Sequence, residues 1–273
     1  MPLHRRRPED TALIRLLQLT DFHLRLQPGD TLLGVDTEHS FKGTLRTALA
    51  EGITPDLALL TGDLAQDATA ETYQRLARAL ADLPCPAYCL PGNHDDPALM
   101  AAHLASQRLH CQPLIQLDHW QIICLNSTIP HSPLGRLSDS ELELLRHGLE
   151  ADSQRHTLIA LHHHPVASGS AWMDRMQISN ADSLFAVLRH YPTVRGIVFG
   201  HIHQALDQTL EGIRLLGSPS TCFQFKPGQA EFALDALPPG YRWIELHDDG
   251  RIETRVHRMD ALPVGLKLGS GGY

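Results

Sequence analysis

Five short stretches of the sequence carry histidine, aspartate or asparagine, and each follows an apolar run that is typical of a buried strand. They are Asp21-x-His23, Gly62-Asp63, Gly92-Asn93-His94-Asp95, His162-His163-His164-Pro165 and Gly200-His201-x-His203. Ligands of open α/β sheets bind at the carboxyl edge of the strands, so we expect these side chains to meet there. Imidazole, carboxylate and amide groups in one place predict a metal site with a proton donor beside it.

The donor types and their number indicate which metals the site would take. Nitrogen and carboxylate-oxygen ligands without thiolates suit Mn, Fe, Zn or Co, and do not suit Ca or an iron–sulfur cluster. If His94 is set aside, the candidate ligands exceed what one tetrahedral zinc needs, which predicts two metals. Asp63 stands alone after its strand and is the natural bridge between ions about 3.5–4 Å apart. The seven candidates are Asp21, His23, Asp63, Asn93, His162, His201 and His203.

Composition excludes several other classes of protein. The chain has 273 residues, of which 42% are hydrophobic and 20% charged, as in an ordinary globular protein. Its net charge of −8 argues against a nucleic-acid or anionic-membrane partner. A phosphate substrate therefore requires a locally positive site. Two carboxylates among seven ligands leave two divalent cations undercompensated, which provides that local charge.

The cysteines and the start of the chain bear on its compartment. The five cysteines are odd in number, widely spread and form no C-x-x-C pair, which favours reduced thiols. The apolar run 13–19 is interrupted by Arg15 and Gln18, so we expect neither a signal peptide nor a membrane span. These features predict a cytoplasmic protein. The cysteines are Cys85, Cys89, Cys111, Cys124 and Cys222.

Strands and helices are expected to alternate over most of the chain and to give way to hairpins. Strands are predicted at 15–19, 57–60, 87–90, 121–125, 157–161 and 194–199, with helices near 37–51, 69–82, from 97, 138–151 and 180–190. Asn180 is expected to cap the last helix. The second helix is expected to start near Asp67 or Thr69, with Asp67 as a cap. Hairpins are predicted at 206–216 and 242–256. We expect one domain, residues 1–273, with a mixed sheet core covered by helices and a loose tail at 262–273.

The motif order D-x-H, G-D, G-N-H-D, H-H-x-P, G-H-x-H is similar to that of the calcineurin-like metallophosphoesterases. Within that superfamily the chain resembles the bacterial class III 3′,5′-cyclic AMP phosphodiesterases, with supporting stretches at 61–67, 161–165 and 219–227. The likeness extends from about residue 15 to residue 257. It implies an α/β fold in which a four-layer αββα sandwich of mixed sheets is flanked by helices. A dinuclear metal centre is expected at the carboxyl edge of the strands.

The resemblance also implies a role for each site residue. It assigns one metal to Asp21, His23, Asp63 and His203, and the other to Asp63, Asn93, His162 and His201. The metals are expected to be iron with manganese, with zinc or cobalt as substitutes. Asn93 and His94 would contact the substrate phosphate, His94 would stabilise or protonate the leaving oxygen, and Asp95 is included among the catalytic residues.

The expected reaction is hydrolysis of 3′,5′-cyclic AMP to 5′-AMP, by in-line attack of a metal-bridging hydroxide. The substrate is a small molecule, and the oligomeric state is left open. The same site would also suit 2′,3′-cyclic nucleotides or glycerophosphodiesters. A metal- or nucleotide-binding sensor without turnover is the alternative from another class, and His94 speaks against it because a sensor needs no leaving-group acid.

Several side chains keep two interpretations. His162 fits the ligand position, and His163 could instead donate a hydrogen bond to a carboxylate or carbonyl near the metals. Asp95 either accepts the other ring proton of His94 or begins the helix at residue 97, and Asp67 is a rival for the first role. Three aromatic side chains either stack on a nucleobase or simply pack within their loops, and packing is favoured for each. These are Trp172, Phe223 and Phe225.

Overall fold

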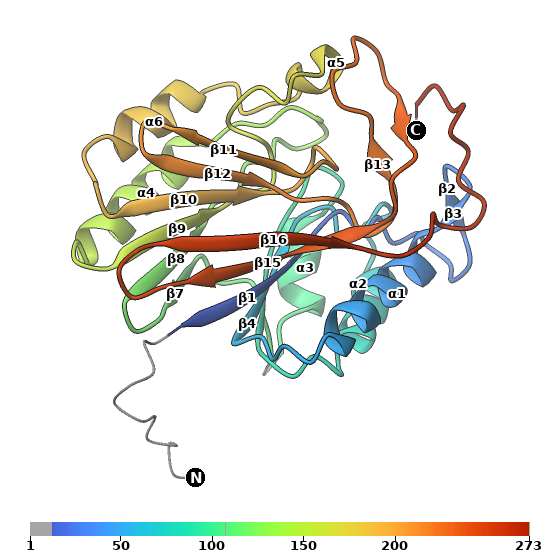
Figure 1. The fold of residues 1–273 in the computed structure, drawn as a ribbon, viewed down its shortest axis with the longest axis horizontal. Coiled ribbons are helices and arrows are strands. Elements are labelled where there is room, and N and C mark those ends of the chain that lie inside the picture. Colours follow the sequence, from blue (N-terminus) through green and yellow to red (C-terminus); the bar gives the residue numbers. More distant parts are fainter. Residues whose placement is uncertain (1–12, 107, 273) are drawn as a thin grey trace.

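The first of two six-stranded sheets contains the N-terminal strands and the C-terminal hairpin (Figure 1). The computed structural model describes residues 13–106 and 108–272. The order of the first sheet is β16-β15-β1-β4-β5-β6, in which β1, β4, β5 and β6 are parallel, β15 is antiparallel to β1, and β16 is antiparallel to β15. Its strands are β1 (Ile14–Leu19), β4 (Leu57–Thr61), β5 (Ala87–Leu90), β6 (Leu109–His110), β15 (Gly240–Leu246) and β16 (Ile252–Arg258).

The second sheet has the order β11-β12-β10-β9-β8-β7 and a parallel centre formed by β12, β10, β9 and β8. The edge strands β11 and β7 are antiparallel to their neighbours. Its strands are β7 (Leu114–Gln116), β8 (Trp120–Cys124), β9 (His156–Ala160), β10 (Val194–Phe199), β11 (Leu206–Leu210) and β12 (Ile213–Gly217).

Helices cover the outer face of each sheet. The helices α1 (Thr37–Ala50), α2 (Ala70–Ala79) and α3 (Pro97–His103) lie on the first sheet. The helices α4 (Asp139–Ala151) and α6 (Ala181–Leu188) lie on the second, and the short α5 (Ala171–Asp174) lies apart from them. Two short hairpins, β2 (Thr31–Leu32) with β3 (Val35–Asp36) and β13 (Gln224–Phe225) with β14 (Leu234–Asp235), complete the described elements.

Three separate hydrophobic clusters show that there are four layers. One cluster joins α1–α3 to the first sheet, and includes Phe41, Tyr73 and Leu17. Another joins α4 and α6 to the second sheet. The third lies between the two sheets and includes Leu16 and Trp120. Because the central strands are covered on both faces, most of their residues are apolar and buried, as in β4, where all five residues are buried. The predicted fold class, mixed sheets flanked by helices, is confirmed.

Two predicted helix caps are wrong. Asn180 precedes α6 but makes no capping hydrogen bond; its side chain instead accepts from Leu137 N at 3.0 Å and donates to Leu137 O at 2.8 Å. Asp67 does not cap α2, because Thr69 accepts from Thr72 N there. The Asp67 carboxylate accepts from Leu26 N at 2.8 Å instead. Both side chains connect loops that are distant in sequence, and local sequence does not reveal such contacts.

The ends of the chain are described only in part. Residues 1–12 and Tyr273 lie outside the described residues. The predictions about the N-terminal segment and the tail fall partly on them. In the segment after β16, Lys267 N–H donates to Leu33 O at 3.0 Å, beside the β2–β3 hairpin. Within the described part of the chain, no helix combines the length and the apolar character that a bilayer crossing requires.

Candidate metal centre

The five predicted motifs meet at the carboxyl ends of the parallel strands of both sheets. Asp21 and His23 follow β1, Asp63 follows β4, and the Asn93–His94 pair follows β5. In the second sheet, His162 follows β9 and the pair of His201 and His203 follows β10. The two sheets are joined here, because His201 N lies 3.1 Å from Asp21 Oδ1. The structure therefore brings all seven candidate ligands and His94 into one region.

One group of donors consists of Asp21, His23 and His203, whose ligand atoms all lie within 4.8 Å of one another. The Nε2 atoms of His23 and His203 are 3.2 Å apart, and Asp21 Oδ1 lies 3.3 Å from His203 Nε2. All three side chains are buried. Burial lowers the pKa of His23 to about 3, so its ring is neutral and its Nε2 can offer a lone pair.

Asp63 lies between this group and a second one. Its Oδ2 is 3.8 Å from His23 Nε2 and 3.3 Å from His162 Nε2. Its Oδ1 accepts a hydrogen bond from His94 N at 2.9 Å. Burial would raise the pKa of Asp63, but the His162 ring counters this and holds that pKa well below its usual range. The carboxylate is thus ionised and placed where a bridge between two cations would stand.

The second group adds Asn93 and His201. Asn93 Oδ1 lies 3.2 Å from His162 Nε2. His201 Nε2 is buried and has no hydrogen-bond partner among the described residues. A buried imidazole nitrogen without a partner is costly unless something binds it, and a divalent cation satisfies that requirement. The donor set and this unpartnered nitrogen both fit a metal ion.

In three of the candidate histidine ligands, the ring nitrogen Nδ1 lies at hydrogen-bonding distance from an oxygen of the chain. His23 Nδ1 lies 2.8 Å from Gln66 Oε1, and His162 Nδ1 lies 2.8 Å from Thr61 O. His203 Nδ1 lies 2.8 Å from Phe223 O. Acceptors at Nδ1 set the tautomer and turn Nε2 toward the metal position, as is usual for metal-binding histidines.

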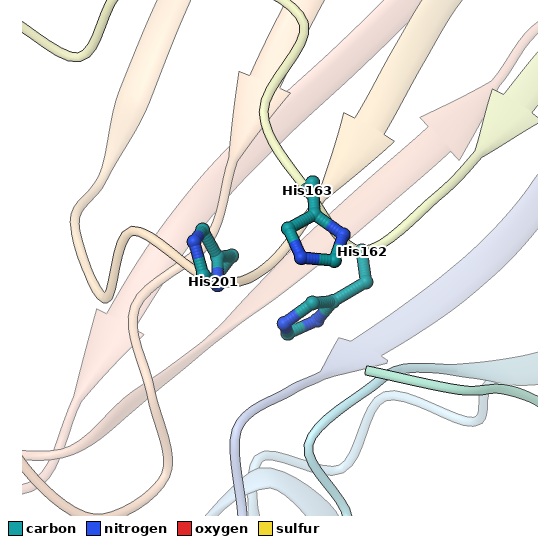
Figure 2. A group of neighbouring side chains, drawn as sticks. All are labelled: His162, His163 and His201. Carbon is teal, nitrogen blue, oxygen red and sulfur yellow. The ribbon is translucent and has the colours of Figure 1, made fainter. Parts of the chain in front are cut away.

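The His163 ring lies beside these candidate ligands. Figure 2 shows its ring beside those of His162 and His201, and the three rings offer ligand atoms within 4.8 Å of one another. His163 Nδ1 lies 2.8 Å from Ser127 Oγ, and its Nε2 is buried without a partner in the described chain. The choice of His162 over His163 as ligand stays a prediction. His164 lies farther out, with its Nε2 3.5 Å from Asp174 Oδ1.

The backbone at the ligand positions is strained. Five candidate ligands have positive φ angles between 46° and 65°, a region that non-glycine residues rarely adopt. Each such residue costs about 1–3 kcal/mol and persists only where the surroundings enforce it. Tight approach enforces it here, since a Cβ on Gly92 would collide with Asp63 and one on Gly200 with Thr20. The five are Asp21, His23, Asp63, His201 and His203.

Asp95 connects the two loops that follow β4 and β5. Its carboxylate accepts hydrogen bonds from Leu64 N and Ala65 N at 3.0 Å and from Gly92 N at 2.9 Å. It also accepts from the Tyr73 hydroxyl at 2.9 Å. Burial and the nearby Asp63 raise its pKa to about 6. These contacts hold the loops in place, and a catalytic role of Asp95 toward the His94 ring stays a prediction.

A cavity of about 410 Å³ opens over the donors. Its floor includes Asp63, Asn93, His94 and His201, and its walls come from the loops after β8 and around α5. The lining residues that the sequence did not indicate are His131, Ser132, Pro133, Phe232 and Gly272. His131 lies several residues after strand β8, in a Pro-His-Ser-Pro turn. Its φ of 59° is unusual for a residue other than glycine.

The three aromatic residues of open role differ in the structure. Phe223 is fully buried and stacks on His23, with ring centroids 5.7 Å apart. Phe225 is 2% exposed and stacks on His203 at 4.1 Å. These contacts favour packing for both, because their faces support the histidine rings. Trp172 is half-buried, lines the cavity, and has an indole nitrogen without a hydrogen-bond partner among the described residues.

Comparison with known proteins gives a consistent result. A family model described as calcineurin-like phosphoesterase matches residues 14–205. The chain is 40% identical over 273 residues to a Pseudomonas aeruginosa protein named 3′,5′-cyclic adenosine monophosphate phosphodiesterase CpdA, with 100% of both chains covered. A protein of the same name from Escherichia coli strain K12 is 42% identical over 263 residues, 96% of each chain. A dimetal phosphatase structure from Danio rerio superposes with a TM-score of 0.59 at 14% identity, over 90% of this chain and 98% of that one, which shows a shared fold.

Proposed function

Because the chain belongs to the calcineurin-like phosphoesterase family, we propose that it is a metal-dependent phosphodiesterase that hydrolyses 3′,5′-cyclic AMP to 5′-AMP. The observation that carries the proposal is the position of the Asp63 carboxylate, between His23 and His162 at the floor of an open cavity. The substrate rests on relatives that bear this activity in their names and match the chain over nearly its whole length. The resemblance deduced from the motifs is thus confirmed at the level of the family.

The proposed ligands divide into two sets that share Asp63. Asp21, His23, Asp63 and His203 would hold one ion, and Asp63, Asn93, His162 and His201 the other. We propose iron with manganese as the native pair, and zinc or cobalt as substitutes, since imidazole and carboxylate suit all four. When bound, such ions lower the pKa of water and offset the charge of a phosphate group.

The chain's own residues bind and orient the substrate. Asn93 and His94 lie on the cavity floor, where they can donate hydrogen bonds to phosphate oxygens. The bond from His94 N to Asp63 fixes the loop that carries the ring. We assign His94 the proton that the leaving 3′ oxygen requires, and a positioned acid of this kind usually contributes about 10²- to 10⁴-fold in rate. The cavity has the size of a typical small-ligand site.

A panel of diesters tests the proposal directly. Protein reconstituted with Mn²⁺ or Fe²⁺ should cleave 3′,5′-cyclic AMP with a higher kcat/KM than 2′,3′-cyclic AMP or glycerophosphodiesters. Preference for either of those substrates would replace the proposed substrate and leave the dinuclear hydrolase in place. Tight metal and nucleotide binding with no turnover of any diester would instead indicate a sensor.

We further propose a cytoplasmic location and a small-molecule substrate as the main partner. All five cysteines are free thiols, although Cys89 and Cys111 lie close together. Unpaired cysteines in proximity are typical of a reducing compartment. Cyclic nucleotides are themselves small molecules, so the partner follows from the proposed reaction.

A further inference from the structure

Three of the five cysteines line one cavity behind the catalytic loop. This cavity has a volume of about 220 Å³ and lies between α3 and the ends of β5 and β8. Cys89, Cys111 and Cys124 contribute to its wall, together with Leu90 and Pro91. Pro91 is two residues from Asn93, so the cavity borders the start of the loop that carries Asn93 and His94.

The strand register brings two of these thiols together. β5 pairs with β6 in parallel, with Ala87 opposite Leu109 and Tyr88 opposite His110. If this register continued one residue past the end of β6, Cys89 would stand opposite Cys111. Neighbouring strands lie about 4.8 Å apart, which falls within the Cα separation of about 4.4–6.8 Å that a disulfide spans. Both side chains line the same cavity, and each thiol is near enough to shift the pKa of the other.

The three thiols differ in reactivity. Cys111 is only partly buried, and the neighbouring Cys89 thiol lowers its pKa. Cys89 is 4% exposed, and its pKa is raised by the neighbouring Cys111 thiol and by burial. Burial also raises the pKa of Cys124, to about 12, which keeps that thiol protonated. Oxidants attack thiolates, so Cys111 is the side chain that reacts first.

We propose that Cys89 and Cys111 form a peroxide-sensitive dithiol site whose oxidation to a disulfide slows turnover at the metal centre. The Cys111 thiolate attacks one oxygen of hydrogen peroxide; the S–O bond forms, the O–O bond breaks, and a water molecule leaves after taking up a proton. The Cys89 sulfur then attacks the Cys111 sulfenic acid, which forms the S–S bond and releases a second water. Two thiols are oxidised and one peroxide is reduced, and a dithiol reductant reverses the step by exchange.

Only a few residues separate the two thiols from the groups that are proposed to carry out hydrolysis. Cys89 lies within β5, and only Leu90, Pro91 and Gly92 separate it from Asn93. Gly92 packs against Asp63 so closely that no Cβ fits between them. A covalent bond that moves the end of β5 therefore moves the loop against the bridging carboxylate. Displacements of about 1 Å in a catalytic group can cost roughly 100-fold in rate.

The test uses zinc-loaded holoenzyme, because zinc has no redox chemistry of its own. Hydrogen peroxide should remove the mass of two hydrogen atoms and yield a peptide pair joined through Cys89 and Cys111. Hydrolysis of bis(p-nitrophenyl) phosphate should fall by about 10- to 100-fold and recover with dithiothreitol. This substrate keeps the result independent of whether cyclic AMP is the natural one, although the loss of activity presupposes the proposed phosphodiesterase.

Variants separate this pair from the other thiols. Cys111→Ser and Cys89→Ser should remain active after peroxide treatment, whereas Cys85→Ser and Cys124→Ser should be inhibited like the wild type. In Cys89→Ser, dimedone should label Cys111. A disulfide that joins Cys111 to Cys124, or full activity of protein shown by peptide mapping to carry the Cys89–Cys111 bond, would overturn the proposal. If the serine variants do not fold, that mapped wild-type protein still decides it.

Discussion

The floor and the rim of the catalytic cavity differ in burial and in the backbone that carries their side chains. At the floor, the ligand candidates Asp63 and His201 are at most 5% exposed, and each stands two residues past a strand end. The walls of the cavity form its rim, where His131 comes from the loop after β8 and is exposed, and Trp172 comes from the short helix α5 and is half-buried. The floor has the strained backbone and tight contacts that fix a geometry, and the rim has open faces that can recognise a ligand. Reaction type therefore belongs to the floor and substrate choice to the rim.

The largest effect should come from the centre of the floor. Asp63→Asn removes the charge that stands between His23 and His162, so we expect loss of bound metal and no measurable hydrolysis. Elemental analysis and a diester assay check both results. Asp207→Asn, at an exposed ion pair with Arg214, is the matched control and should keep metal and activity. Full activity in exhaustively demetallated wild-type protein would contradict the assignment of the floor to metals.

The next prediction separates two neighbouring floor histidines. His162→Ala should lose one metal and most activity, because His162 Nε2 faces both Asp63 and Asn93. His163→Ala should keep more metal, because its ring is anchored to Ser127. Metal content per chain measures the difference. If His163→Ala lost more metal than His162→Ala, the ligand would be His163 and not His162.

His94 should matter for rate and not for metal. His94→Ala is expected to retain both ions and to lose about 10²- to 10⁴-fold in kcat, the usual range for a positioned acid. His190→Ala, an exposed residue just past α6, serves as the control. A variant that lost one ion would show that His94 is itself a ligand and that the floor is larger than we propose.

The same contrast explains what could be predicted from sequence. Floor residues such as Asp63 and His201 follow apolar strands directly, so local pattern and strand topology place them. The four-layer arrangement came from the resemblance, because periodicity gives strands and helices but not how two sheets stack. Strands of two or three residues, such as β6 and β13, were missed since they are too short to show a period.

Rim residues and some loop contacts depend on tertiary structure. Phe232 reaches the cavity through contacts with Phe225 and Trp172, and nothing in its neighbouring sequence indicates this. Asn180 was mistaken for a cap because its partner, Leu137, is 43 positions away. The sequence does not decide the role of Phe223 and Phe225 for the same reason, because only the folded chain shows that they stack on His23 and His203.

The smallest expected effect lies on the rim, at Trp172. Its ring lines the cavity above the floor and meets Phe225 and Phe232 edge-on, which leaves its position suited to a purine face. Stacking of a base on an aromatic ring is worth about 1–3 kcal/mol, so Trp172→Ala should raise KM for 3′,5′-cyclic AMP by roughly 5- to 150-fold. Stacking is remote from the reacting phosphorus and acts equally on ground and transition states, so kcat should change little.

Two comparisons make this last result decisive. Trp172→Phe keeps an aromatic face and should keep KM close to the wild-type value. Bis(p-nitrophenyl) phosphate has no purine, so its hydrolysis should be nearly unchanged in Trp172→Ala. If both substrates lose activity together and metal content falls, Trp172 acts through Phe225 and His203, which it supports from the side. In that case Trp172 would belong with the residues that support the metal ligands, and recognition of the base would have to come from the wall that contains His131.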